Sequence, residues 1–389
     1  MKKIAMILHC GTVGGSGLGL LTTAKMLRDR YDIVVYCPAR PKDIYRRFEA
    51  EGFAVKAHPA PLPTYGYFNG GPALLTNSCC SALWEQEKCI PAWRREFEQE
   101  GIDVLLANSI VLSWMYRCVE GLPCKTICHV REVLRSKRTF LGRRILRELE
   151  NFDMVWYISD YEMERHALSH PKKAIVRDCL LDDQAAAVEP ARGGEENDFR
   201  VLYVGGASKL KGFPTLIRAA RRLDDKITVR VAGYLSCAKP GLTPGNLLYF
   251  TRFFQYFAMR RALEDAKAQK NVELLGFCPD LNALFAECDA LVFPSSKAHQ
   301  ARPAFEAGVY AKPVIISDFP DTRDNVRDGE NGVTFKPNSP RALAKAIDRL
   351  AGDPELCRRL GEKNREMALT YHTYEKVSEA VQAAMEELL

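Results

Sequence analysis

One carboxylate, Glu306, stands between two apolar runs where it could accept hydrogen bonds from sugar hydroxyls. The runs ALVF (residues 290–293) and VIIS (residues 314–317) have the length and composition of buried parallel strands. Pro303 opens a helical segment between them, which places Glu306 in its first turns. Ligands bind at the carboxyl ends of such strands, and a helix N-terminus can hold a phosphate. The segment suits a nucleotide-linked sugar, although a solvated glutamate on an ordinary crossover helix fits the spacing equally well.

Two lysines form a second candidate group, in the loop GGASKLKG of residues 205–212. The loop follows an apolar strand and precedes a helical segment, and Lys209 and Lys211 beside free backbone amides could hold a diphosphate. The GK[ST] sequence of a P-loop is absent, so ATP hydrolysis is not expected. Taken alone, a solvated lysine pair at a turn is the commoner explanation. Because Glu306 is expected on the same side of the same sheet, we favour the diphosphate site.

A histidine ends another predicted strand, KTICHV of residues 125–130, and Arg131 and Glu132 follow it. If His129 faces a cleft between two domains, it could donate a hydrogen bond to a substrate. A histidine satisfied within the core fits the same position equally well.

A glycine loop, GGSGLG of residues 14–19, follows the first predicted strand. Glycines there allow a ligand to approach the backbone and leave amides free for an anion. A dinucleotide site would need the order GxGxxG and an acid at the end of the second strand, where this chain has Cys37-Pro38-Ala39. A dinucleotide is therefore not expected, and a tight strand-to-helix turn competes with substrate binding.

The sequence offers no clustered ligands for a metal ion. No DxD sequence occurs, and the thirteen cysteines include no CxxC pair and no His/Cys cluster. We therefore expect no metal and no cofactor, and lysines and helix amides would have to neutralise a diphosphate. No Ser/His/Asp or Cys/His signature stands out either.

The composition indicates a soluble globular protein, with 47% hydrophobic and 27% charged residues in 389. The formal charge of +6 does not demand nucleic acid, although it would not oppose a nucleotide or an acidic membrane surface. The apolar run at the N-terminus is read as a strand because it is short and leads into the glycine loop. No run reaches the ~20 apolar residues of a membrane span. We expect a cytoplasmic protein with reduced thiols.

Alternating strands and helices predict an α/β fold with two doubly wound parallel sheets. Residues 1–183 form the first expected domain, 184–198 a polar linker, 199–370 the second domain, and 371–389 a helix that returns to the first. The expected strands lie at residues 4–8, 33–37, 103–108, 125–130 and 154–159, and then at 201–206, 228–234, 272–277, 290–293 and 314–317. The chain is helical from about Pro340.

Two further segments could touch a partner. Residues 131–148 carry seven basic and two acidic side chains, a net charge of +5. They could lie on anionic lipid or bind an acidic acceptor, although a solvated helix face is the commoner explanation. Residues 247–262 (LLYFTRFFQYFAMRRA) hold six aromatic side chains and could touch a membrane, but we favour packing on their own domain.

With these pieces in place, the chain resembles the GT-B glycosyltransferases of family 4, also called glycosyl transferases group 1. The matching sequences are YVGGASKLKG, ELLGFCPDLNALFAECDALVFPSS, residues 294–313 and DGENGVTFKP, and the first glycine loop and CHVRE are similar as well. The resemblance covers nearly the whole chain and is strongest over residues 201–337. Each motif is modest, but their order and spacing together are specific.

The resemblance implies two Rossmann-like domains that face each other across a cleft, with the donor on the second domain and the acceptor on the first. It implies retention at the anomeric carbon without a metal, with the leaving diphosphate helping to deprotonate the acceptor. The residues it carries over are Lys211 at the diphosphate, Glu306 at the ribose hydroxyls, Phe277 and Cys278 by the base, His129 at the donor sugar, Gly15 near the diphosphate or the acceptor, and Arg131 and Glu132 on the acceptor side.

This chain departs from the family pattern at two positions. The family often has two glutamates with seven residues between them, but Ala298 stands where the first would be. The resemblance then implies that His299 or Arg302 acts near the donor sugar. The family's diphosphate-binding arginine aligns with Gly206, so Lys209 is expected to substitute.

The leading hypothesis is a retaining glycosyltransferase that uses a UDP- or GDP-sugar and serves surface polysaccharide or glycolipid synthesis. Its acceptor would be a glycan or a lipid-linked molecule, and it could touch the inner face of the membrane. An alternative is a non-catalytic nucleotide-sugar-binding or partner subunit of the same fold, suggested by Ala298 and Gly206. A third is an epimerase or phosphorylase, for which the glutamate pair and a cofactor-lysine signature are both missing.

Overall fold

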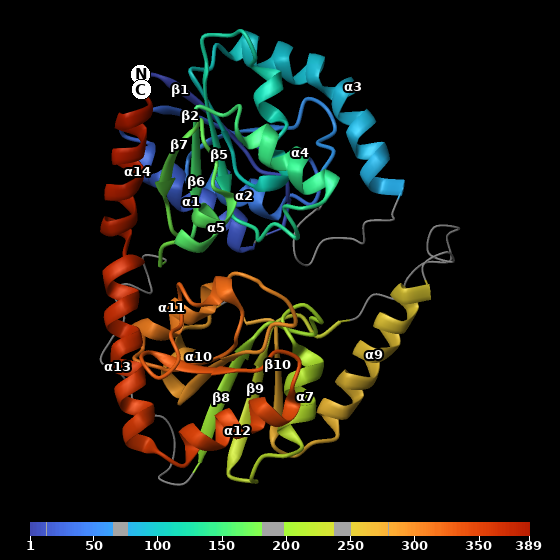
Figure 1. The fold of residues 1–389 in the computed structure, drawn as a ribbon, viewed down its shortest axis with the longest axis vertical. Coiled ribbons are helices and arrows are strands. Elements are labelled where there is room, and N and C mark those ends of the chain that lie inside the picture. Colours follow the sequence, from blue (N-terminus) through green and yellow to red (C-terminus); the bar gives the residue numbers. More distant parts are fainter. Residues whose placement is uncertain (13, 65–76, 181–197, 237–249, 279) are drawn as a thin grey trace. The chain divides into compact units, whose positions relative to one another are not determined.

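The computed structural model describes residues 1–12, 14–64, 77–180, 198–236, 250–278 and 280–389, with the side chains of 77–82 and 250–252 left aside (Figure 1). The chain divides into two compact units. Unit 1 comprises Met1–Cys179 and Tyr374–Leu389, and unit 2 comprises Leu180–Thr373. The expected linker at 184–198 lies, apart from Asp198, outside the described residues.

Unit 1 is built on a seven-stranded sheet in the order β3-β2-β1-β4-β5-β6-β7, and every neighbouring pair is parallel. The central strands are almost completely buried because helices cover both faces of the sheet, as apolar runs without alternation require. The strands are β1 (Lys3–Ile7), β2 (Asp32–Cys37), β3 (Ala54–Ala57), β4 (Val104–Ala107), β5 (Lys125–Val130), β6 (Met154–Tyr157) and β7 (Lys172–Ile175).

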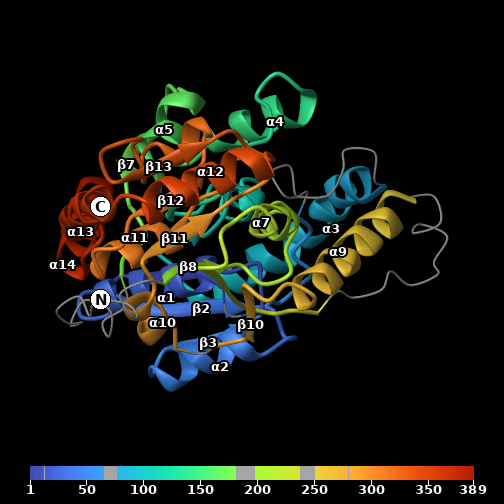
Figure 2. The ribbon, with the colours of Figure 1, turned by 90° about the horizontal axis from the view of Figure 1, so that it is seen from below.

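The helices of unit 1 form two layers. On one face, α1 (Gly15–Leu27), α2 (Asp43–Ala50) and α14 (Tyr374–Leu388) share an apolar core with the sheet, and α14 lies beside α1 (Figures 1 and 2). On the other face, α3 (Asn77–Glu100), the short helices η1 (Ile110–Leu112) and η2 (Met115–Cys118), and α4 (Phe140–Leu149) enclose a second core. A shorter helix, α5 (Asp160–His166), joins β6 to β7.

Unit 2 repeats the plan with a six-stranded parallel sheet in the order β10-β9-β8-β11-β12-β13. The strands are β8 (Phe199–Val204), β9 (Ile227–Ala232), β10 (Val272–Gly276), β11 (Ala290–Phe293), β12 (Val314–Ser317) and β13 (Gly332–Phe335). Two parallel doubly wound sheets were predicted, and this prediction is confirmed.

Helices also cover both faces of the second sheet. One core contains side chains of α7 (Phe213–Ala220), α9 (Phe250–Lys267) and α12 (Pro340–Ala351). The other contains side chains of α10 (Asn282–Glu287) and α11 (Arg302–Val309), and α13 (Pro354–Tyr371) packs against α11 (Figure 2). A short helix, η3 (Pro320–Thr322), follows β12.

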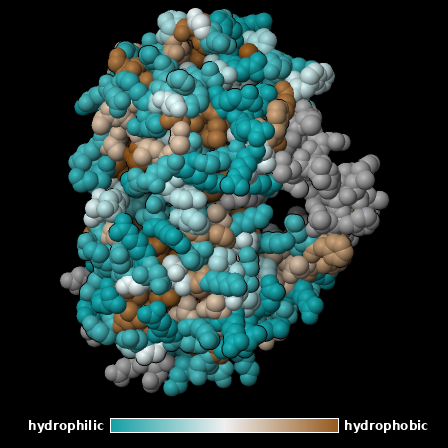
Figure 3. All heavy atoms as spheres, viewed as in Figure 1, coloured by the Kyte–Doolittle hydropathy of each residue, from teal (hydrophilic) through white to brown (hydrophobic). Residues whose placement is uncertain are grey.

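The aromatic segment at 247–262 forms part of α9, as far as it is described. Met259 and Ala262 are buried in the core of unit 2, whereas Phe254 and Phe257 are 72% and 57% exposed. Figure 3 shows apolar atoms on the surface over this helix. Packing on its own domain therefore accounts for one side of α9 and leaves two aromatic rings in solvent.

Candidate functional site

The site predicted around Glu306 lies where the chain direction reverses in the second sheet. β8 has β9 and then β10 on one side and β11 and then β12 on the other, so the loops after β8 and β11 leave in opposite directions. In open α/β sheets the crevice between such loops is the usual ligand site. Ser296 of one loop donates its backbone N–H to the Leu210 carbonyl of the other at 2.8 Å.

Two glycines allow the loop after β8 to approach the loops after β11 and β9. Gly212 has φ +84°, and a Cβ there would lie 1.7 Å from the Pro294 carbonyl oxygen. Gly206 has φ +57°, and its Cβ would lie 2.4 Å from the Tyr234 carbonyl oxygen. A side chain at either position would strain the backbone and collide with it. The local fold therefore demands glycine where the family resemblance places a diphosphate-binding arginine.

Lys211 is half-buried in the loop after β8, next to the start of α7. Burial lowers the pKa of its ammonium group, and the nearby Glu306 carboxylate opposes that shift. Among the described residues, no carboxylate forms an ion pair with Lys211 or with the exposed Lys209. A partly desolvated cation without a bound carboxylate favours the binding of an anion.

Glu306 lies in the second turn of α11 and is 7% exposed. Its Oε1 atom accepts a hydrogen bond from Nε of Arg302, the first residue of the helix, at 2.8 Å. No described hydrogen bond reaches Oε2, so one carboxylate oxygen is held in place and the other can accept hydroxyl groups. The structure thus brings Lys211, Arg302 and Glu306 to the same edge of the sheet.

His299 is the half-buried neighbour of Lys211 on the loop after β11. Its ring stacks on that of Phe293, with centroids 6.1 Å apart and an interplanar angle of 12°. Burial first, and then the positive charge of Lys211, lower the pKa of His299 to about 4. His299 is therefore a neutral imidazole at pH 7, able to donate one hydrogen bond and accept another.

The two residues expected near the base, Phe277 and Cys278, follow β10. The Phe277 ring is 59% exposed and stacks on Tyr234, which follows β9, with centroids 4.8 Å apart and planes 16° from parallel. Cys278 is half-buried and donates its Sγ–H to the Gly276 carbonyl at 3.7 Å. Tyr234 was not singled out from the sequence, although an aromatic residue at the end of a predicted strand was a usable signal.

His129, in unit 1, is 1% exposed in β5. Its Nε2 atom lies 3.0 Å from the Val176 carbonyl oxygen, and its ring meets Trp156 edge-on at 5.8 Å. Burial first, and then Arg131, lower its pKa to about 3, so the ring is neutral. These contacts are those of a packed histidine, the alternative that the sequence left open, and contact with a donor sugar stays a prediction.

Loops at the carboxyl edge of the first sheet are connected by hydrogen bonds and an ion pair that involve Arg131, Glu132 and Gly15. The Arg131 guanidinium is paired with Asp178 and donates to the Gly15 carbonyl at 3.3 Å. Glu132 accepts hydrogen bonds from Ser109 Oγ at 2.8 Å and from the backbone N–H of Ile110 at 3.0 Å. Their polar atoms are thus engaged within unit 1, and contact with an acceptor stays a prediction.

Two polar residues at this edge were missed. Asn108 follows β4, is fully buried and donates to Ser16 O and Ser16 Oγ, both at 3.1 Å. Its Oδ1 atom has no hydrogen-bond partner among the described residues. His9 follows β1, and burial lowers its pKa. Because β1 and β4 flank the reversal point of this sheet, the first polar residues after their apolar runs were a readable signal.

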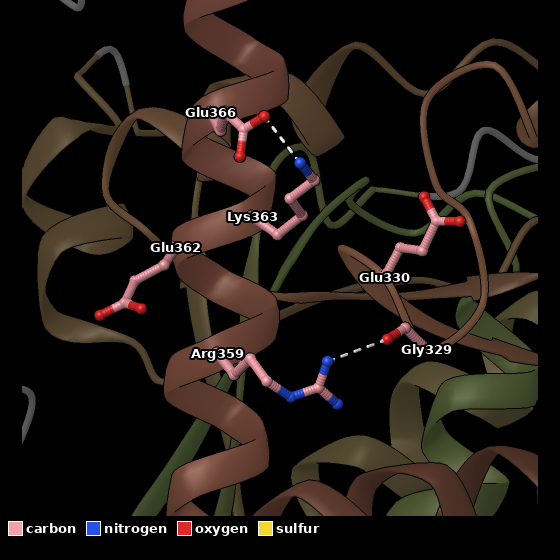
Figure 4. A pocket seen from close by; sticks show the side chains of 6 residues that line it. All are labelled: Gly329, Glu330, Arg359, Glu362, Lys363 and Glu366. Atoms are coloured by element: carbon pink, nitrogen blue, oxygen red, sulfur yellow. Dashed lines mark hydrogen bonds and ion pairs between the residues drawn. The ribbon is translucent and has the colours of Figure 1, made fainter.

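A pocket of about 420 Å³ opens elsewhere in unit 2, between α13 and the turn that precedes β13 (Figure 4). Arg359 points from α13 toward this turn and donates to the Gly329 carbonyl at 3.4 Å, while Lys363 pairs with Glu366 at 2.6 Å. The turn leads into the amino end of β13. The pocket therefore lies away from the carboxyl edge that carries the candidate site.

No helix in the described part of the chain has the length and apolarity that crossing a membrane requires. Among the same residues, no group of three or more His, Cys, Asp or Glu side chains could hold a metal ion.

Residues 187–367 match the family model described as glycosyl transferases group 1. The chain is 31% identical over 302 residues to the uncharacterized glycosyltransferase MJ1178 of Methanocaldococcus jannaschii, a match that covers 75% of this chain and 77% of that protein. The chain belongs to the glycosyl transferases group 1 family.

Two more comparisons concern a second relative and a solved structure. EpsD of Bacillus subtilis, named as a glycosyltransferase, is 29% identical over 197 residues, which span 50% of this chain and only 48% of EpsD. The structure of Anabaena HepE in complex with UDP and glucose superposes with a TM-score of 0.74 at 16% identity, over the full length of both chains. This similarity shows that the fold is GT-B.

Proposed function

We propose that this glycosyltransferase takes a sugar from a nucleoside diphosphate and transfers it to a hydroxyl group of a glycan or lipid-linked acceptor. The observation that carries the proposal is the edge of the second sheet, where the partly desolvated Lys211 ammonium lies without a carboxylate ion pair next to the neutral His299. The complex of HepE with UDP and glucose supports a nucleotide-sugar for a chain of this fold.

The diphosphate would bind to Lys211 and to the amides at the start of α7, with the exposed Lys209 as a second cation. Gly206 would let the diphosphate approach the backbone. The ribose hydroxyls would donate to Oε2 of Glu306, and the base would lie by Cys278 and the stacked rings of Phe277 and Tyr234. A flat aromatic pair of this kind suits the face of a uracil or guanine ring.

The ion pair between Arg302 and Glu306 supports different roles for the two residues that could replace the missing acid at Ala298. Arg302 uses its Nε atom to hold the glutamate that would receive the ribose. His299 lies close enough to Lys211 for the ammonium charge to lower its pKa. We therefore assign the donor sugar to His299 and a positioning role to Arg302.

We further propose that transfer proceeds with retention and without a metal, as in family 4. The bond between the anomeric carbon and the diphosphate oxygen breaks, and the acceptor oxygen bonds to the same face of that carbon. The acceptor proton passes to the leaving diphosphate, whose charge Lys211 stabilises. His129 stays proposed at the donor sugar, Gly15 near the diphosphate or the acceptor, and Arg131 and Glu132 on the acceptor side. A cytoplasmic location at the inner face of a membrane is proposed as well.

The departures at Gly206 and Ala298 favour one rival: a partner subunit that binds a nucleotide-sugar but does not transfer it. In that case the protein would bind UDP or GDP and release no sugar from any donor. The Lys211 ammonium is common to both functions, so nucleotide binding alone does not separate them.

The test uses a panel of UDP- and GDP-sugars with the full-length protein, and measures nucleotide release with and without candidate acceptors. We expect one donor to be consumed, and the variants Lys211→Met and Glu306→Gln to lose at least 100-fold in kcat/KM while staying folded. The matched control is Lys226→Met, an exposed lysine of unit 2. Full activity in folded Lys211→Met would overturn the site, and no turnover with any donor would favour the binding subunit.

A further inference from the structure

The residues at and around the start of α4 carry four exposed positive charges. Lys137, Arg138, Arg143 and Arg147 are all exposed. Among the described residues none of the four forms an ion pair with a carboxylate, and the hydrogen bonds of three of them go to backbone carbonyls. The acid on this helix, Glu148, is buried and is held by Arg144 at 2.8 Å and Ser113 at 2.6 Å. The charge of these four side chains is therefore not neutralised locally.

On α13 and α14, several cations pair with acids of the same helix. On α13, Arg358 pairs with Glu355 and Glu362, and Lys363 pairs with Glu366. On α14, Lys376 pairs with Glu379 at 2.9 Å. Such pairs one turn apart are what an ordinary solvated helix face shows. The four cations around α4 lack them, as do the exposed Arg341, Lys345 and Arg349 of α12 among the described residues, so charge alone does not distinguish this surface.

An exposed aromatic ring belongs to the same surface. Phe140, the first residue of α4, is 60% exposed. The helix cannot turn to bury it, because Leu141, Ile145 and Leu149 fill the core on its inner side. Thr139 caps the helix by accepting a hydrogen bond from the Gly142 N–H at 3.2 Å. A fixed helix thus presents one apolar ring among four cations.

We propose that this surface, formed by Lys137, Arg138, Phe140, Arg143 and Arg147, docks the protein on an anionic lipid bilayer. Anionic headgroups would neutralise the positive charges of the four basic side chains. The phenyl ring would enter the interface between headgroups and acyl chains. This proposal rests on charge and exposure in unit 1 and does not depend on the proposed function.

The lipid surface fits these observations better than a soluble polyanion does. An exposed phenyl ring has no use in binding an extended phosphate chain, whereas at a bilayer it gains apolar burial. The inner side of α4 is committed to the core, so the helix cannot insert further. Binding must therefore be mainly electrostatic, reversible and sensitive to salt, because the Debye length is only about 10 Å at 0.1 M.

The experiment measures co-sedimentation with vesicles of phosphatidylcholine containing 30 mol% phosphatidylglycerol, against vesicles of phosphatidylcholine alone, at about 20 mM and about 300 mM salt. The test variant is Arg143→Gln/Arg147→Gln. The matched control is Arg358→Gln/Lys363→Gln, which removes the same two charges from α13. A second test variant, Phe140→Ser, removes the ring and leaves the charge.

We expect the unmodified protein to bind the anionic vesicles at low salt and neither vesicle at high salt. Each basic residue near an anionic surface strengthens binding about fivefold, so the α4 double variant should bind about 25-fold more weakly, and the α13 control within about twofold of the parent. Phe140→Ser should weaken binding several-fold. All variants should keep the parent's circular dichroism spectrum.

Three results would overturn the proposal. The first is no binding to anionic vesicles at low salt. The second is an equal loss in the α4 and α13 double variants, which would mean that net charge alone matters. The third is binding to soluble polyphosphate as tight as to vesicles, together with no effect of Phe140→Ser, which would assign the surface to a soluble polyanion.

Discussion

The two sheets share one strand plan, but the charged groups at their carboxyl edges have different partners. In unit 1, Arg131 is paired with Asp178, and both oxygens of Glu132 are occupied within the unit. In unit 2, Lys211 lies beside Glu306, whose Oε1 is already bound to Arg302. The charged groups at the edge of unit 1 are already paired or hydrogen-bonded within the unit, so this edge needs no ligand to neutralise them. We propose that a ligand completes the edge of unit 2, where Lys211 has no ion pair, and that this ligand is the anionic part of the donor.

The largest expected effect comes from removing the carboxylate that pairs with Arg131 in unit 1. Asp178→Ala leaves the buried Arg131 guanidinium without its carboxylate, which should destabilise unit 1 by about 3 kcal/mol. Hydrogen exchange should then be faster in peptides around residues 14–19 and 128–132. Exchange around residues 205–212 and UDP or GDP binding should stay unchanged.

The control for that change is Asp318→Ala, which removes the exposed partner of Arg323 in unit 2. A surface pair of this kind is worth at most about 1 kcal/mol. If Asp178→Ala destabilised the protein no more than Asp318→Ala does, the ion pair between Arg131 and Asp178 would not stabilise the carboxyl edge of the first sheet.

The second effect concerns the glycine that replaces the family's arginine. Gly206→Arg forces a side chain onto a residue with φ +57° and against the Tyr234 carbonyl. We expect a loss of about 2 kcal/mol in the free energy of unfolding of unit 2, and weaker nucleotide binding. Lys209→Arg, which places a guanidinium on an exposed residue of the same loop, should leave affinity within about twofold. Tighter nucleotide binding by Gly206→Arg would show that the loop can accept the family's arginine.

The third effect tests Lys211, whose ammonium group has no carboxylate ion pair. Lys211→Met should weaken the binding of a nucleoside diphosphate by about 2 kcal/mol, roughly 30-fold in Kd, because charge-assisted hydrogen bonds are lost. Isothermal titration calorimetry against Lys226→Met gives the comparison at equal net charge. The folded state itself should not weaken, since Lys211 has no carboxylate ion pair to lose. A marked loss of stability would mean that the Lys211 ammonium has a stabilising partner within the folded protein.

The smallest effect is a difference between two neutral histidines. Bound diphosphate beside Lys211 favours the imidazolium form, so it should raise the pKa of His299 from about 4 by about one unit. By linkage, the nucleotide should bind more tightly as the pH falls through this range. His129, whose pKa of about 3 reflects burial within unit 1, should not move. Nuclear magnetic resonance titration of the ring carbons, with and without UDP, measures the pKa values of both histidines. An equal change in the two pKa values would contradict the placement of the diphosphate beside His299.

The sequence was sufficient where a residue's role depends on its own strand or helix. The runs at 290–293 and 314–317 are β11 and β12, and their order with the loop at 205–212 correctly placed Lys211 and Glu306 at one edge. The edge strands β3 (AVKA), β7 (KKAI) and β13 (GVTF) were not predicted. One side of an edge strand is unpaired, so the sequences of β3 and β7 need not be apolar.

Roles that depend on distant contacts could not be predicted in this way. His129 meets Trp156 and the Val176 carbonyl, which lie 27 and 47 residues further along the chain, so its packing depends on the assembled sheet. The need for glycine at Gly206 comes from the Tyr234 carbonyl in the next loop. The Arg302–Glu306 pair has helical spacing, but only the structure shows that it leaves His299 as the group beside Lys211.

The most direct test of the central claim is a crystal structure of the full-length protein with UDP or GDP, whichever binds more tightly. We predict that the diphosphate lies within about 3 Å of Lys211 Nζ, that the ribose hydroxyls donate to Glu306, and that the base lies by Phe277. A nucleotide held at the carboxyl edge of the first sheet, without contact to Lys211, would contradict the account.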